Sequence, residues 1–186
     1  MSQERRNELV DDIVETQPRL ANFVRTRSGD LIAGSWDLLS YSFQSGFELM
    51  WDHAYAQTSG VLTRPLLSLW RQSVELALKS AITDISGGLD RKLGHDLQAL
   101  FAELIMTRAA LGHDDDDDLA HNVTTMIGLV QSLDPFADRF RYPESRKGQP
   151  FEGIEVDLDP LFQAHWIIVT WCEGAAIETR EARGPA

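Results

Sequence analysis

The stretch LWRQSVELALKSAI, residues 69–82, constrains the fold of this chain more than any other. Its apolar spacing predicts a helix over 65–84. Nearly every side of this helix is apolar or small, so we expect it to be buried on most of its faces. One stripe breaks the pattern, because Arg71, Glu75 and Lys79 follow one another at four-residue spacing and share one side of the helix.

Three interpretations of this charged stripe stay open. In the first, the stripe meets solvent as ion pairs worth about 0.3–0.5 kcal/mol each. In the second, it faces the GHDL turn at 94–97 and the loop RFRYPESRKG at 139–148, which we call the arginine-rich loop. The stripe then forms a polar cluster inside the bundle. Glu75 would then pair with Arg71 and Lys79, since buried charges need partners. In the third, this cluster lines a pocket for a ligand or RNA.

Helical periodicity along most of the chain predicts an all-α fold, a single bundle of about six helices. The 186 residues suit one domain over 1–186, with 1–34 as an N-terminal helical extension and 36–178 as the core. The expected helices cover residues 3–25, 36–56, 65–84, 95–111, 119–133 and 159–179.

We expect the 65–84 helix to lie at the centre of this bundle, with Trp70, Leu76 and Leu78 buried. The helices at 36–56 and 159–179 should pack against it.

The net charge of −12 argues against broad, charge-driven binding of nucleic acid. It leaves room for a local basic site, because salt screens charges beyond about 10 Å. Cations gather in the loop RFRYPESRKG, where Arg141, Arg146 and Lys147 lie beside Tyr142. This loop either holds a phosphate or a base by charge and stacking, or is fixed by local ion pairs with Glu144 and the acidic surface.

Signals for metal, cofactor or membrane are weak. The five histidines lack metal-ligand spacing, and Cys172, the single cysteine, excludes an internal disulfide and a thiolate-rich zinc site. We therefore predict no metal and no cofactor. The aspartate run at 114–118 is interpreted as a solvated loop that complements the dipole of the next helix. No apolar run reaches the roughly 20 residues of a membrane span, and the N-terminus lacks an apolar signal segment, so we expect a cytoplasmic protein without membrane association.

Three motifs in fixed order, ELALK at 75–79, GHDL at 94–97 and FRYP at 140–143, resemble those of the HEPN superfamily. The resemblance covers roughly residues 36–178. It implies an α-helical bundle that is often dimeric, so we expect a homodimer. It also implies one of two functions: a metal-independent ribonuclease of toxin–antitoxin and antiviral systems, or an inactive partner or nucleotide-binding module.

The resemblance divides the candidate site residues between these two functions. Catalytic members carry an arginine followed four to six residues later by a histidine; the FRYP loop has no such histidine, and the match in this chain is Arg108 with His113. We expect a non-catalytic or partner-dependent module of a prokaryotic defence or toxin–antitoxin system, which binds a protein partner, a nucleotide or RNA. The alternative is a metal-independent endoribonuclease that uses Arg108 and His113. The expected ligand or RNA-binding residues are Arg71, Glu75, Lys79, His95, Arg141, Tyr142, Arg146 and Lys147.

Overall fold

The structure, a computed structural model, describes residues 3–8, 34–56 and 60–183. The chain divides into two units, 1–33 and 34–186. In the first unit the described residues, 3–8, are helical. The rest of the helix expected over 3–25 lies outside the described residues.

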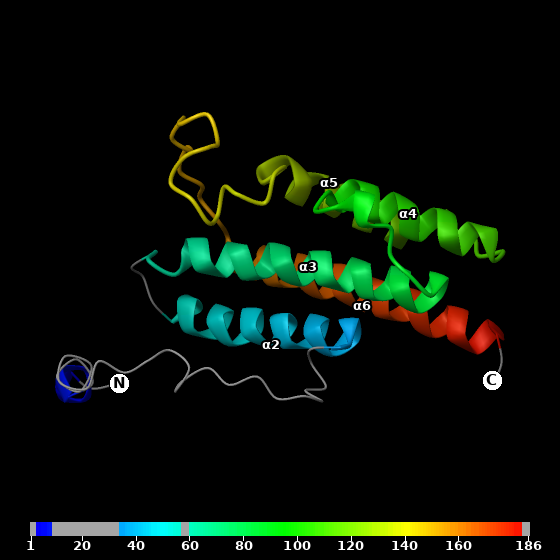
Figure 1. Cartoon of the computed structure of the whole chain (residues 1–186), viewed down its shortest axis with the longest axis horizontal. Helices are drawn as coiled ribbons and strands as arrows, with labels where there is room; N and C mark the ends of the chain where they lie inside the picture. The colour runs from blue at the N-terminus through cyan, green and yellow to red at the C-terminus, as the bar shows by residue number, and fades with distance from the viewer. Residues whose placement is uncertain (1–2, 9–33, 57–59, 184–186) are drawn as a thin grey trace. The chain divides into compact units, whose positions relative to one another are not determined.

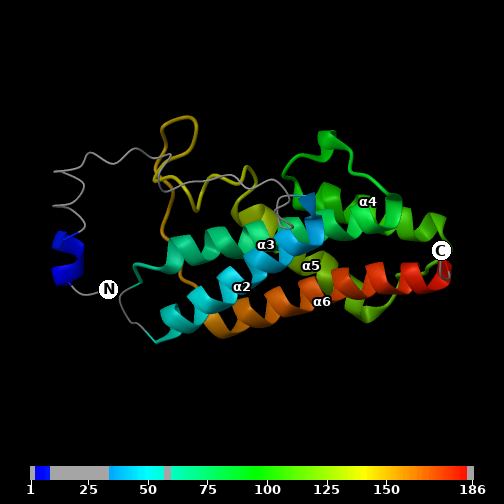
Figure 2. The same ribbon diagram turned by 60° about the horizontal axis from the view of Figure 1, so that its bottom comes forward.

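The second unit is a bundle of α helices, and the all-α prediction is confirmed (Figures 1 and 2). Its described residues contain no strand, only an isolated bridge between Glu144 and Pro150. The elements follow in the order α2 (Trp36–Tyr55), α3 (Thr63–Ser86), the short 3-10 helix η3 (Arg91–Leu93), α4 (Leu97–Ala110), α5 (Asp118–Leu133) and α6 (Leu158–Arg183).

Helix α3 is the central element of this unit. It packs against α2, α4 and α6, while α5 packs against α4 and α6. Thirteen of its 24 residues are buried, far more than a helix with one covered face would bury. Trp70, Leu76 and Leu78 are among them, as predicted from the apolar spacing. The predicted packing of the 65–84 helix against its neighbours at 36–56 and 159–179 is also confirmed.

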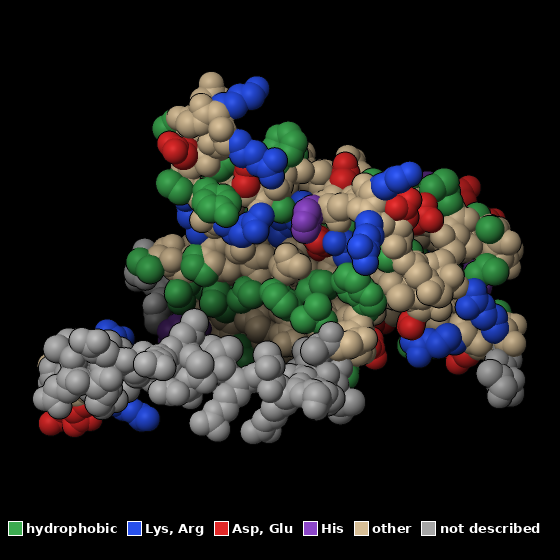
Figure 3. Space-filling view, viewed as in Figure 1, with side chains coloured by type: hydrophobic (Ala, Val, Ile, Leu, Met, Phe, Trp, Pro, Cys, Tyr) green, Lys and Arg blue, Asp and Glu red, His purple; other side chains and the backbone are tan. Residues whose placement is uncertain are grey.

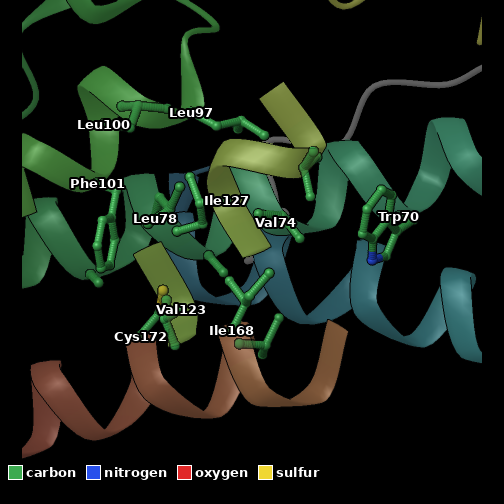
Figure 4. Packing of buried hydrophobic residues seen from close by; sticks show 14 of the residues in the cluster. Trp70, Val74, Leu78, Leu97, Leu100, Phe101, Val123, Ile127, Ile168 and Cys172 are labelled. Carbon is green, nitrogen blue, oxygen red and sulfur yellow. The ribbon is translucent and has the colours of Figure 1, made fainter. Parts of the chain in front are cut away.

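The hydrophobic core surrounds α3 and includes residues of α2, α4, α5 and α6, and Figure 4 shows side chains of α3, α4, α5 and α6 meeting there. Leu78 of α3, Ile127 of α5 and Ile168 of α6 are each at most 1% exposed. Each such side chain contributes roughly 1.5–3 kcal/mol when it leaves water. Apolar burial from five helices therefore holds the bundle together.

Local signals set the helix ends that matter for the site. Gly87 ends α3 in the left-handed conformation, with φ of 79°, which glycine adopts without steric cost. The Asp96 side chain then accepts the backbone N–H of Ala99 and starts α4. The GHDL turn is thus fixed between two well-defined helix ends.

Leu78→Ala tests the central position of α3. Because Leu78 is fully buried, we expect the free energy of unfolding to fall by about 2–5 kcal/mol in urea denaturation followed by circular dichroism. Leu49→Ala on α2 is the matched control, since Leu49 is 72% exposed and its replacement should change stability by less than about 0.5 kcal/mol. Equal decreases in the two variants would contradict a core built around α3.

Candidate functional site

The charged stripe of α3 forms a buried cluster around the Glu75 carboxylate. Lys79 Nζ lies 2.7 Å and His95 Nδ1 2.8 Å from Glu75 Oε1, and Arg71 Nη1 lies 3.1 Å from Oε2. Arg71 and Glu75 are only 2% and 1% exposed. The interpretation of the stripe as a polar cluster inside the bundle is confirmed, and the interpretation as a solvated stripe is wrong, because neighbouring segments cover the stripe.

Arg71 ties this cluster to two non-helical segments. Its Nη2 donates to the backbone oxygen of His95 at 2.8 Å, and its Nε donates to that of Asp134 at 3.1 Å. The Asp134 side chain in turn accepts the backbone N–H groups of Asp138 and Arg139, at 2.8 and 3.0 Å. One arginine therefore positions both the GHDL turn and the base of the arginine-rich loop.

The electrostatics of the cluster favour a charged Glu75. Burial alone raises the pKa of a carboxyl group, but the hydrogen bonds and positive charges of Lys79 and His95 outweigh burial, so the pKa of Glu75 lies below its ordinary value. Asp134 Oδ2 adds a second carboxylate 3.6 Å from Arg71 Nε. The carboxylates of Glu75 and Asp134 match the two permanent cations, Arg71 and Lys79.

His95 is the exposed member of this cluster. Its side chain is 66% exposed even though its Nδ1 is held by Glu75. Glu75 fixes the ring in one orientation, as a buried carboxylate does for a histidine at many ligand sites. The predicted residues in the cluster are Arg71, Glu75, Lys79 and His95. Of these, His95 has the side chain that is mostly exposed to solvent.

The arginine-rich loop brings together the other predicted ligand residues. Arg141, Tyr142 and Arg146 line a cavity of about 710 Å³ that also contains the carboxylates of Asp138 and Glu144. The Arg141 guanidinium lies 5.8 Å from the centre of the Tyr142 ring. Lys147, next to this cavity, is exposed. The loop thus presents cations beside an aromatic ring, as expected for a site that binds a phosphate or a base.

Local ion pairing also contributes to the loop, but with a different partner from the one expected. Arg146 Nε lies 3.7 Å from Asp138 Oδ2, and the Arg146 guanidinium lies 5.9 Å from the centre of the Phe136 ring. The Arg146 side chain is still 78% exposed, so it keeps donors available to solvent. An exposed pair of this kind adds only about 0.2–1 kcal/mol, which leaves Arg146 free to move.

Several exposed cations lie near the arginine-rich loop and the turn before α4. Figure 3 shows Lys and Arg side chains and a histidine gathered below the loop and along α3. In the turn before α4, Arg91, Lys92 and His95 are all exposed. We call the exposed cations of the 91–95 turn and the 139–147 loop, together with Tyr142, the basic face.

Arg108 and His113 line one cavity, but the arginine is already engaged. Its Nε and Nη2 donate to Asp115 at 2.7–3.1 Å, Nη2 also donates to Glu178 at 2.9 Å, and Nη1 donates to the Ala175 carbonyl at 2.8 Å. The hydrogen bonds to Asp115 are the main reason why the pKa of Arg108 lies above its ordinary value. The guanidinium is held by carboxylates in the place where a phosphate would have to bind.

The aspartate run has specific roles that its composition does not reveal. Asp115 binds Arg108, and Asp117 accepts the backbone N–H of Ala120 at 2.7 Å and so caps α5. The sequence predicted acidic residues that complement the dipole of this helix, but not the capping hydrogen bond of Asp117. The Asp115 partner was missed, although a buried arginine near the end of α4 requires a carboxylate close by.

A buried hydrogen bond between Ser73 and His165 was also missed. Ser73 Oγ lies 2.9 Å from His165 Nε2, and both residues are at most 1% exposed. Burial lowers the pKa of His165 from its ordinary value of 6.5 to about 4, so the ring is neutral at pH 7. The available signal was a small polar residue and a lone histidine on otherwise apolar helix faces.

Metal and membrane features are absent from the described part of the chain. No group of three or more His, Cys, Asp or Glu residues is placed there to hold a metal ion. None of its helices combines the length and the apolar character that crossing a membrane requires. Cys172 is buried, and burial raises the pKa of its thiol to about 12, which makes it unreactive.

Comparison of the chain with protein-family models, curated proteins and solved structures finds no match. The resemblance to the HEPN superfamily therefore stays an expectation that rests on the three motifs.

Glu75→Gln tests the central role of the Glu75 carboxylate. The variant removes the carboxylate that Arg71 and Lys79 share and leaves Asp134 as the one carboxylate near Arg71, so we expect the free energy of unfolding to fall by about 3–5 kcal/mol in urea denaturation. Glu173→Gln, at an exposed position of α6, makes the same chemical change and should alter stability by less than about 0.5 kcal/mol. A decrease in Glu75→Gln as small as that of the control would mean that the cluster does not hold the bundle.

His165 makes stability depend on pH. Between pH 6.5 and 4 the unfolded chain binds a proton at His165 that the folded chain does not, so the free energy of unfolding should fall by about 1.4 kcal/mol for each unit that the pH decreases. His165→Gln can keep the hydrogen bond to Ser73 and should remove this contribution between pH 6.5 and 4.5. His121→Gln, which alters an exposed ring, should retain it. An unchanged slope in His165→Gln would contradict a neutral, buried His165.

Proposed function

We propose that this chain is a HEPN-like binding module without catalytic activity of its own, acting with a protein partner in a prokaryotic defence or toxin–antitoxin system. The defence context and the homodimer that we expect both rest on the resemblance of the ELALK, GHDL and FRYP motifs. Within this proposal the basic face binds a nucleotide or RNA, or receives the partner.

The engagement of Arg108 is the observation that carries this proposal. Catalysis by an arginine–histidine pair needs a guanidinium that holds the phosphate while the histidine transfers a proton. Arg108 instead donates to two carboxylates and a carbonyl. Phosphates approaching it would also meet the negative charges of Asp114 and Asp117, which line the same cavity.

The basic face supports binding of a phosphate-bearing ligand. Arg146 and Lys147 are exposed cations on the loop, and the Tyr142 ring, 54% exposed, is available for stacking. Arg91 and Lys92 extend the positive charge to the turn before α4. Glu75 and Arg71 hold this turn and the base of the loop in place, which reduces the entropy cost of binding a ligand.

The second candidate function is a metal-independent endoribonuclease. One observation favours it: Arg108 and His113 line the same cavity, which has room for a nucleotide. For this activity Arg108 would have to exchange Asp115 and Glu178 for a phosphate.

RNA binding and RNA cleavage can be measured on the same sample. With a labelled single-stranded RNA in EDTA, we expect a salt-dependent rise in fluorescence anisotropy and intact RNA on a gel. The double variant Arg146→Ala, Lys147→Ala should bind more weakly, because it neutralises two fewer phosphates. The slope of log affinity against log salt should therefore decrease by roughly 1.4, which is about 0.7 for each of these phosphates.

Arg180→Ala is the matched control for this experiment. Arg180 is an exposed cation of α6 outside the basic face, paired with Asp84, and its removal should leave RNA affinity unchanged. RNA affinity that is equal in all three proteins would reject the basic face as the RNA site. Cleavage in EDTA that disappears in a folded His113→Ala variant would replace the binding module with the endoribonuclease. Cleavage that is lost in Arg141→Ala but kept in His113→Ala would instead assign the scissile phosphate to the loop.

A further inference from the structure

The cavity that contains Arg108 and His113 carries negative charge and shares no lining residue with the loop cavity of the basic face. It has a volume of about 550 Å³ and lies between the 113–117 loop and α6. The Arg108 guanidinium is outnumbered there by four carboxylates, which leaves an excess of three negative charges when His113 is neutral. These carboxylates belong to Asp114, Asp115, Asp117 and Glu178.

Another part of the lining of this cavity is aromatic and apolar. Trp166 and Trp171 of α6 line it together with Ile167. Trp166 is 45% exposed and Ile167 is 40% exposed, so both side chains present apolar surface to solvent. The face of an aromatic ring attracts a cation, and a tryptophan ring does so most strongly.

Arg108 shows how carboxylates and an aromatic ring act together on a cation in this cavity. Its guanidinium carbon lies 5.7 Å from the centre of the Trp171 ring, while Asp115 and Glu178 bind its nitrogens. The same two kinds of group remain available nearby. Asp114 is exposed and makes no hydrogen bond or ion pair with any described residue, and the Trp166 ring is partly open to solvent.

We propose that this cavity binds an organic cation, a guanidinium or alkylammonium group on a short apolar stem. Asp114 supplies the negative charge and Trp166 the aromatic surface, while Arg108 and its two carboxylates form the fixed end of the site. The volume lies within the range of sites for small ligands, about 300–1,000 Å³. The proposed function also uses the engagement of Arg108, but the cation site shares no residue with the basic face, so a failure of RNA binding there leaves this proposal unchanged.

The test uses the full-length chain and two pairs of probes that differ in charge and little in shape. Butylguanidinium is compared with neutral butylurea, and the capped tripeptide Gly-Arg-Gly is compared with Gly-citrulline-Gly. Binding is followed through the indole N–H signals in ¹H–¹⁵N NMR spectra. We expect the cations to shift the Trp166 and Trp171 signals and to leave Trp36 on α2 unchanged, with much weaker binding of the neutral probes.

Two pairs of variants locate the site. Asp114→Asn and Trp166→Ala should each weaken cation binding roughly two- to five-fold, as expected for one exposed charge pair or one aromatic contact. Asp116→Asn and Trp36→Ala are the controls, since Asp116 belongs to the same aspartate run and Trp36 is similarly exposed, yet neither lines the cavity. Thermal unfolding of each variant checks that the fold is retained.

The outcomes separate the two sources of the cation. Tighter binding of the arginine tripeptide than of butylguanidinium assigns the cavity to a basic side chain of a protein, and equal binding assigns it to a free small cation. The proposal is overturned if butylurea binds as tightly as butylguanidinium, if the Trp166 and Trp171 signals do not move, or if the control variants weaken binding as much as Asp114→Asn and Trp166→Ala.

Discussion

The Glu75 carboxylate, held by Arg71, Lys79 and His95, is the interaction on which the rest of the second unit depends. The charged stripe lies on a covered side of α3, so its charges must be neutralised by partners next to them. Pairing within the stripe lets α3 pack against α2, α4 and α6 at once. Through Arg71 the same charges position the turn and the loop that form the basic face.

A second buried arginine follows the same rule at the other end of α4. Arg108 holds the 113–117 loop against α6 through Asp115 and Glu178, as Arg71 holds the 134–139 segment against α3 through Asp134. In both places a buried guanidinium attaches a loop to a helix. Its several N–H donors can bind more than one acceptor at the same time. The cations left for ligands are therefore those outside these two clusters.

The features of the fold and of the cluster that could be predicted from the sequence came mostly from local residue patterns. The position of α3, its burial and the pairing of Glu75 with Arg71 and Lys79 all follow from spacings of three and four residues. Asp134 and His165 were not predicted as partners of Arg71 and Ser73, because they lie 63 and 92 positions away along the chain. Periodicity specifies which face of a helix is buried, but it does not specify which distant polar group meets that face.

The reactivity of the Cys172 thiol can report how often the core opens. The single thiol lies 1% exposed beside the α3 residues of the core, and with a pKa of about 12 it has almost no thiolate at neutral pH. A thiol reagent can reach it only in molecules whose α3–α6 packing has come apart, so the rate of labelling measures how often these helices separate. The dynamics of the central helix can thus be timed at native conditions without adding a probe or changing a residue.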